Sequence, residues 1–76
     1  MNDLLTREGM KYIISRLIDR AHEAAQESRE KPADEFAAGR KVAYYEMLDI
    51  LKSELTIREQ DLKELGIDID IEKSIA

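Results

Sequence analysis

Apolar residues between positions 36 and 65 follow two neighbouring lines, in which members are spaced by three, four or seven residues. The first line consists of Tyr44, Leu48, Leu51, Leu55, Leu62 and Leu65, with Arg58 as a polar member. The second consists of Phe36, Ala43, Met47, Ile50 and Ile57. Such spacing places each line along one face of an α-helix, and the two lines together span roughly 150° of its circumference. One packed helix does not cover so wide a face. The pattern therefore predicts one line packed against the first half of the chain and the other against a second copy.

The first half of the chain predicts a second amphipathic helix, from about residue 4 to residue 29. Its apolar positions keep the same helical spacing and include Met10, Ile14, Leu17, Ala21 and Ala24. The apolar side chains are large in the first half of this helix and small in the second, and small residues let helix axes approach closely. Asn2, Asp3 and Thr6 are alternative N-caps.

The segment around Pro32 predicts a turn over residues 30–32 between these two helices. Proline lacks an amide hydrogen and disfavours helical geometry at the residue before it, while it suits the first turn of a new helix. A connection this short favours an antiparallel hairpin. In that hairpin we expect Phe36 to face the alanine-rich end of the first helix. A single bent helix is the alternative.

The second helix is predicted to run from about residue 33 to residue 65 and to end at Gly66, a residue type common just after helix ends. Thr56 and Glu59 also fit a capping box that would start a separate helix at Ile57, but the unbroken leucine spacing favours one continuous helix. In the tail, residues 66–76, positions 67–71 alternate apolar and acidic residues as a short strand would, but the sequence offers no second strand to pair with. We expect a turn of helix or a loop there, with Asp68 or Asp70 as possible caps.

These elements predict a single all-α domain over residues 1–76. Its fold would be an antiparallel two-helix hairpin with a short C-terminal helical turn, and two copies would form a four-helix bundle. A chain of 76 residues has a small core, and without cysteine it cannot add disulfides. A partner chain is then the main remaining means of stabilising the fold. The predicted core and dimer-interface residues are Met10, Ile14, Leu17, Phe36, Ala43, Tyr44, Met47, Leu48, Ile50, Leu51, Leu55 and Leu62.

Charge and hydropathy narrow the classes of partner. The net charge is −5 at pH 7 and the isoelectric point is near 4.8. Affinity for nucleic acid requires a concentrated excess of lysine and arginine, which this chain lacks. Its longest apolar run is too short to span a bilayer, and its first residues lack the order of a signal peptide. We therefore expect a cytoplasmic protein with no membrane contact, which binds a second copy and an unidentified protein.

No residue pattern in the sequence predicts catalysis, a metal site or a cofactor. His22, Glu23 and Gln26 match only the first part of a helical zinc motif, because glutamine replaces the second histidine and the chain contains no other. A nucleophile with its base and a glycine-rich phosphate loop are also missing from the sequence. We expect a non-enzymatic interaction or regulatory protein.

Ser15 and Asp19 offer a different functional hypothesis. Their spacing, Ser-x-x-x-Asp, resembles the motif of small helical-hairpin phosphatases of sporulation response regulators, the Spo-zero-E type. That family carries the motif on its second helix, whereas here it lies on the first. The resemblance implies a modulator or phosphatase of a signalling protein. A nucleic-acid regulator is a further alternative, for which Arg16, Arg20, Arg40 and Lys41 would supply the positive charge.

The segment from Phe36 to Leu48, Phe-Ala-Ala-Gly-Arg-Lys-Val-Ala-Tyr-Tyr-Glu-Met-Leu, resembles part of short, uncharacterised helical-hairpin proteins of Firmicutes and their mobile elements. The resemblance implies a helical hairpin and brings no activity with it. Within this segment, Arg40 and Tyr45 are a candidate patch for a partner protein. We expect the charge of Arg40 to meet a carboxylate of another helix, such as that of Glu54 or Asp61.

Overall fold

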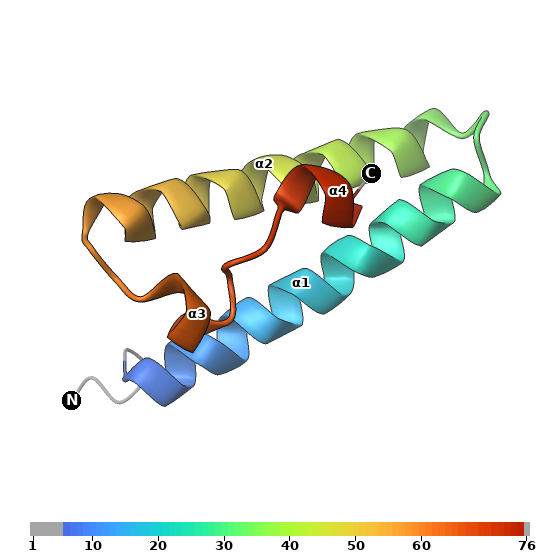
Figure 1. Cartoon of the computed structure of the whole chain (residues 1–76). Coiled ribbons are helices and arrows are strands. Elements are labelled where there is room, and N and C mark those ends of the chain that lie inside the picture. The colour runs from blue at the N-terminus through green and yellow to red at the C-terminus, as the bar shows by residue number, and fades with distance from the viewer. Residues whose placement is uncertain (1–5, 76) are drawn as a thin grey trace.

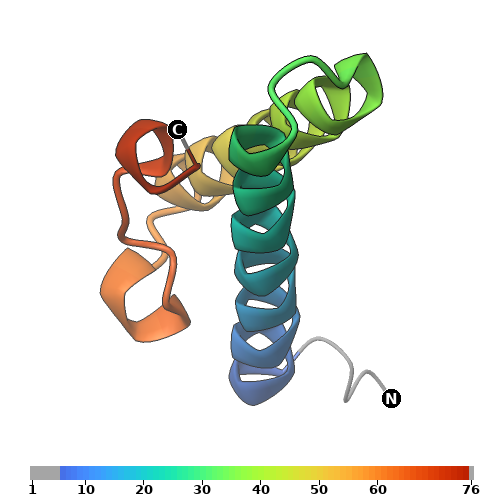
Figure 2. The ribbon, with the colours of Figure 1, turned by 90° about the vertical axis from the view of Figure 1, so that its right-hand side faces the viewer.

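The computed structural model describes residues 6–75, and within this range the chain forms helices and no strands. The helices are α1 (Arg7–Glu30), α2 (Glu35–Ile57), α3 (Leu62–Leu65) and α4 (Ile71–Ile75). α1 and α2 are long and antiparallel (Figure 1). The two short helices lie on one side of this pair (Figure 2). The predicted all-α hairpin with a short C-terminal helix is confirmed.

Side-chain caps set where both long helices begin. Thr6 has extended backbone geometry, and its hydroxyl accepts a hydrogen bond from the Gly9 amide at 3.1 Å, so α1 begins at Arg7. The expected start at residue 4, and the alternative caps Asn2 and Asp3, lie outside the described residues. In the turn, the Asp34 carboxylate accepts from the amides of Phe36 and Ala37, so α2 begins just after it. Such caps satisfy amides that have no partner within the helix.

Alanine side chains line the contact between α1 and α2. Ala21, Ala24 and Ala37 are 0% exposed and Ala25 is 1% exposed. Because alanine side chains are small, the two helices approach closely along this line. The expectation that Phe36 would face the alanines of α1 is wrong, since its side chain is 77% exposed. The Asp34 cap fixes the start of α2, and in that frame Ala37, one residue later, is the buried side chain.

α2 ends at Ile57, so the prediction of one continuous helix to residue 65 is wrong. The Gln60 amide donates to the Leu55 carbonyl at 2.9 Å, and the Glu59 amide donates to the Thr56 carbonyl at 3.0 Å. These two bonds form a Schellman motif, which usually requires a residue with left-handed backbone geometry. Glu59 takes that role with φ of 57°. Because this position carries glutamate and not glycine, the sequence does not indicate that a helix ends here.

A new helix, α3, begins after Asp61, whose carboxylate accepts from the amides of Lys63 and Glu64. Leu62 and Leu65 therefore belong to α3, where Leu65 is buried and Leu62 is half-buried. An ion pair of 3.0 Å between Arg7 and Glu64 joins α3 to the start of α1. The alternative start at Ile57, with Thr56 in a capping box, is not the one that the chain uses, since the cap of the new helix is Asp61.

Gly66 ends α3 with φ of 82°, as predicted, and leads into a C-terminal segment over residues 66–75. The Asp70 carboxylate accepts from the Lys73 amide at 3.2 Å at the start of α4, so the tail forms the expected helical turn. The segment also completes the hydrophobic core. Its buried side chains, with that of Leu65, pack with those of the long helices: Leu65, Ile67, Ile71 and Ile75 on one side, Ile14, Leu48 and Leu55 on the other.

Two hydrogen bonds fix the C-terminal segment on one flank of the hairpin. The Lys52 ammonium donates to the Ile69 carbonyl at 2.6 Å. On α1, the His22 Nε2 atom and the Ser74 hydroxyl are 2.7 Å apart. The segment therefore covers the flank of the hairpin that carries His22 on α1 and Lys52 on α2.

The backbone geometry at Glu59 predicts that Glu59→Gly raises the free energy of unfolding by about 0.5–1 kcal/mol. Left-handed geometry is strained for residues with a Cβ atom and unstrained for glycine. Urea denaturation followed by circular dichroism measures the change. The matched control is Glu46→Gly, in the middle of α2, which should lower the same free energy by about 1 kcal/mol. A loss of stability in both variants would show that Glu59 is helical and that α2 continues beyond Ile57.

The alanine contact predicts that Ala24→Leu lowers the free energy of unfolding by about 1–3 kcal/mol, because the added carbons have no space between the long helices. Ala38 is exposed on α2, so Ala38→Leu should change the same quantity by less than about 0.5 kcal/mol. Thermal melts of both variants provide the comparison. An unchanged melt for Ala24→Leu would contradict the close approach of α1 and α2.

Candidate functional site

The strongest candidate for a functional site is the second apolar line of α2, here called the outer stripe. It consists of Phe36, Ala43, Met47, Ile50 and Ile57, and Arg40 and Glu54 lie at intermediate positions on the same line. The exposed fractions are 77% for Phe36, 45% for Met47, 62% for Ile50 and 70% for Ile57. Four large apolar side chains on one face of one helix thus remain in contact with water.

The first apolar line of α2, in contrast, is covered by the rest of the chain. Leu48 and Leu55 are buried, and Tyr44 and Leu51 are half-buried against the core. The C-terminal segment adds cover only on the flank that carries Tyr45 and Lys52. At 100° per residue, the outer stripe lies on the other flank and on the back of α2. One of the two predicted lines therefore has a partner within the chain, and the other has none among the described residues.

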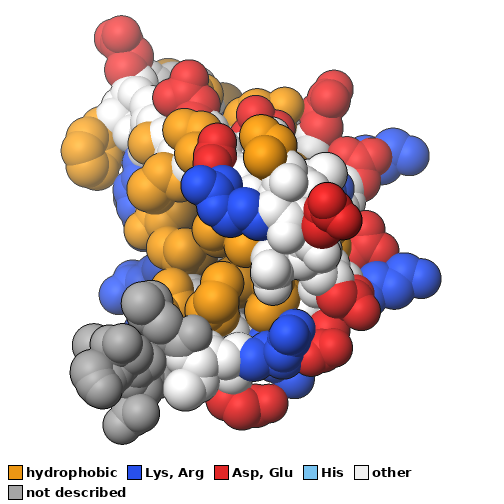
Figure 3. Space-filling model, turned by 90° about the vertical axis from the view of Figure 1, so that its left-hand side faces the viewer, with side chains coloured by type: hydrophobic (Ala, Val, Ile, Leu, Met, Phe, Trp, Pro, Cys, Tyr) orange, Lys and Arg blue, Asp and Glu red, His pale blue; other side chains and the backbone are white. Residues whose placement is uncertain are grey.

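Hydrophobic side chains also gather on the molecular surface. Figure 3 shows them at the end of the molecule where α2 ends and α1 begins, with charged side chains around them and a basic side chain lying across them. Beyond the outer stripe, the large apolar side chains with high exposure are Tyr12 and Ile13 of α1 and Val42 of α2. Contiguous apolar patches of this kind mark interaction surfaces more often than scattered apolar residues do.

Both charged residues of the outer stripe have partners within the chain. The Arg40 guanidinium lies 3.2 Å from the Glu27 carboxylate of α1, and its Cζ atom lies 5.7 Å from the centre of the Tyr44 ring. Glu54 pairs with Arg58 one turn later at 2.5 Å. The carboxylate that meets Arg40 within the chain is thus that of Glu27, rather than that of Glu54 or Asp61. Glu27 and Arg40 lie at similar distances along the chain from the turn. In an antiparallel hairpin, such residues lie at the same level on the two helices, so their spacing in the sequence could have predicted this pair.

The predicted core and interface residues separate into two groups. Those that lie at the contacts among the helices, buried or half-buried, are Met10, Ile14, Leu17, Tyr44, Leu48, Leu51, Leu55 and Leu62. Those that are exposed on the outer stripe are Phe36, Ala43, Met47 and Ile50. Sequence reasoning missed the buried residues Ile67, Ile71 and Ile75, although their spacing of four residues is helical. The sequence predicts a turn of helix or a loop for this segment, but it gives no reason to place these residues in the core.

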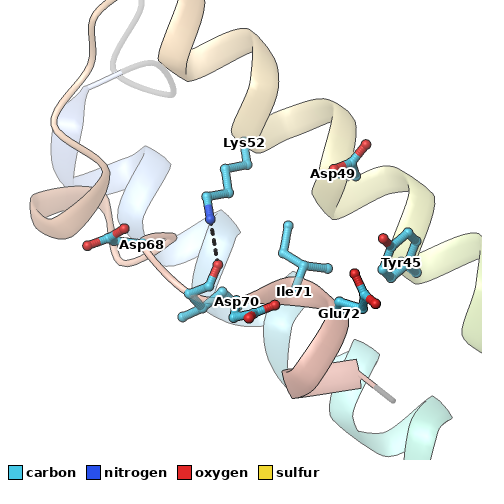
Figure 4. A pocket seen from close by; sticks show the side chains of 8 residues that line it. Tyr45, Asp49, Lys52, Asp68, Asp70, Ile71 and Glu72 are labelled. Carbon is cyan, nitrogen blue, oxygen red and sulfur yellow. Dashed lines mark hydrogen bonds between the residues drawn. The ribbon is translucent and has the colours of Figure 1, made fainter.

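The predicted partner patch, Arg40 and Tyr45, is divided between two surfaces. Arg40 lies on the outer stripe and contacts Glu27. Tyr45 lines an open hollow of about 410 Å³ between α2 and the C-terminal segment, together with Asp49, Lys52, Asp68, Ile69, Asp70, Ile71 and Glu72. Figure 4 shows side chains of α2 along one side of this hollow and carboxylates of the C-terminal segment along the other.

Polar side chains of the hollow have partners within the chain. Lys52 uses its ammonium on the Ile69 carbonyl, and the Asp70 carboxylate caps α4. In residues 6–75, no group of three or more histidine, cysteine, aspartate or glutamate side chains is arranged to hold a metal ion. The chemistry of the hollow is that of a solvated, mainly acidic surface.

The residues of the two alternative hypotheses lie mainly on α1. Ser15 and Asp19 are both exposed, one turn apart. Arg16 and Arg20 are also exposed on α1, and Arg20 pairs with Glu23 at 3.4 Å. Arg40 and Lys41 are half-buried on α2. The positive charges are therefore spread over two helices, and those of Arg20 and Arg40 are compensated by neighbouring carboxylates.

Comparisons of the chain with protein-family models, with curated proteins and with solved structures find no match. Among the described residues, no helix combines the length and the apolar character needed to cross a bilayer. The case for a function therefore depends on the surface of the molecule itself.

Proposed function

We propose that this chain is a non-enzymatic interaction module that acts by self-association, in which two copies pair through the outer stripe of α2. The observation that carries the proposal is the exposure of Phe36, Met47, Ile50 and Ile57 on one face of a helix whose other apolar face is buried. Pairing would bring four long helices together, two from each copy. This arrangement is the four-helix bundle expected from the sequence.

The energetics support pairing of this kind. Full burial of a large apolar side chain contributes roughly 1.5–3 kcal/mol, and a dimer would bury the four large side chains of the stripe on each copy. Association costs roughly 4–15 kcal/mol in lost translational and rotational freedom. Because these side chains are 45–77% exposed in the single chain, their burial would contribute part of that value each. The summed gain and the cost of association are of the same order, which supports a dimer that forms and dissociates reversibly.

The small core provides a second argument. Four of the buried hydrophobic residues are alanines, and each contributes little apolar area to the fold. Small domains with such cores usually need disulfides, a metal or a partner chain. The chain has no cysteine. A second copy on the outer stripe would supply the missing apolar burial.

The proposal predicts that Ile50→Asp converts the dimer to a monomer while leaving the helical hairpin folded. Ile50 is 62% exposed in the single chain, so a carboxylate there remains in water in the monomer and loses its water only in the dimer. Sedimentation velocity at micromolar concentration measures the assembly, and circular dichroism measures the helix content.

The matched control is Val42→Asp, which places the same carboxylate on the same helix at an exposed apolar residue outside the outer stripe. This variant should sediment like the unmodified chain. If both variants behave alike, the outer stripe is not the interface, and if the unmodified chain is a monomer, the chain does not act by self-association.

A further inference from the structure

The outer stripe has a charge order that distinguishes between orientations of two copies. Along α2 its members are Phe36, Arg40, Ala43, Met47, Ile50, Glu54 and Ile57. Met47 lies in the middle, with Arg40 seven residues before it and Glu54 seven residues after it. The two charges are opposite and lie at equal distances from the centre.

We propose that two copies pair their α2 helices antiparallel, about a two-fold axis at Met47, with Arg40 of each copy against Glu54 of the other. This inference rests on the proposed self-association and adds its orientation and register. A two-fold interface is self-complementary, because each contact between one residue and another occurs twice. Pairing about Met47 puts Arg40 and Glu54 at the same level on facing helices in both halves.

The apolar members of the outer stripe fit the same arrangement. The partner copy presents Ile57 opposite Phe36 and Ile50 opposite Ala43, in each pair within one residue of the same level. A large side chain thus meets a small one on each side of the axis, which favours close packing of facing helices. Met47 lies on the axis against the same residue of the partner copy, where its unbranched side chain adapts to the space available.

Parallel pairing would give an unfavourable charge pattern. It would place Arg40 against Arg40 and Glu54 against Glu54, and like charges at the same level repel. The antiparallel arrangement replaces both repulsions by attractions. The present partners are compatible with it, since Arg40 is half-buried beside Glu27 and the Glu54 side chain is 53% exposed, which leaves both groups able to contact a second helix.

Charge reversal tests the register. Arg40→Glu and Glu54→Arg should each weaken the homodimer roughly tenfold or more, because each creates two like-charge contacts. A one-to-one mixture of the two variants should regain the affinity of the unmodified chain, since both contacts in the mixed dimer are again between opposite charges. Asp49→Arg makes the same change in net charge as Glu54→Arg at an exposed position outside the stripe, and it should leave the affinity unchanged.

If the single reversals leave dimer affinity unchanged, the antiparallel register is overturned and the proposed function survives, because in parallel pairing each reversal exchanges one like-charge contact for another. Circular dichroism confirms that each variant is folded. Arg40→Glu also removes the contact with Glu27, so Glu54→Arg, which disturbs only the exposed pair with Arg58, is the decisive variant if Arg40→Glu unfolds.

Distances between spin labels provide an independent test, because the chain has no native cysteine. A label at Glu46→Cys lies near the proposed axis and should give a short distance between copies in either orientation. A label at Glu35→Cys should give about 36 Å in the antiparallel dimer at 1.5 Å per residue, and about 10 Å in a parallel one. A short distance at both positions overturns the antiparallel register. No distance between copies at either position overturns self-association itself.

Discussion

The close approach of α1 and α2 along their alanines is the constraint on which the rest of the structure depends. Ala21, Ala24, Ala25 and Ala37 are almost completely buried, and larger side chains at these positions would force the helices apart. A cap and an ion pair near the turn fix the register of this contact: the Asp34 carboxylate determines where α2 begins, and the Glu27–Arg40 ion pair joins the two helices nearby. A contact built from alanine brings the backbones together but buries little apolar area.

The remaining apolar area has to come from elsewhere in the chain. Leu65, Ile67, Ile71 and Ile75 supply it on one flank, because the Schellman motif at Glu59 turns the chain back toward the hairpin instead of extending α2. The hydrogen bonds from Lys52 and at His22 hold that segment in place. The outer stripe receives no such cover from the described residues. The structure thus covers one apolar face of α2 within a single chain and leaves the other exposed among the described residues.

Sequence reasoning was successful where periodicity and caps act locally. The two long helices, the turn near Pro32 and the stop at Gly66 follow from residue spacing and from residues with restricted backbones. It failed where the deciding residue has no local signature. Glu59 adopts a geometry usually reserved for glycine, and the frame set by Asp34 buries Ala37 and leaves Phe36 outside. The role of Ile67, Ile71 and Ile75 depends on contacts distant in the sequence. Of the candidate site, the existence of a second apolar line was predictable, whereas the division of Arg40 and Tyr45 between two surfaces required the three-dimensional arrangement.

Light scattering of the unmodified chain over a range of concentrations is the most direct test of the claim that the outer stripe binds a second copy. At micromolar concentration and above, the weight-average mass should rise toward twice the 8.8 kDa of one chain and then stop rising, as a closed two-fold dimer requires. A mass that stays at 8.8 kDa throughout, in a protein whose circular dichroism shows the helix content of the folded chain, would contradict the account.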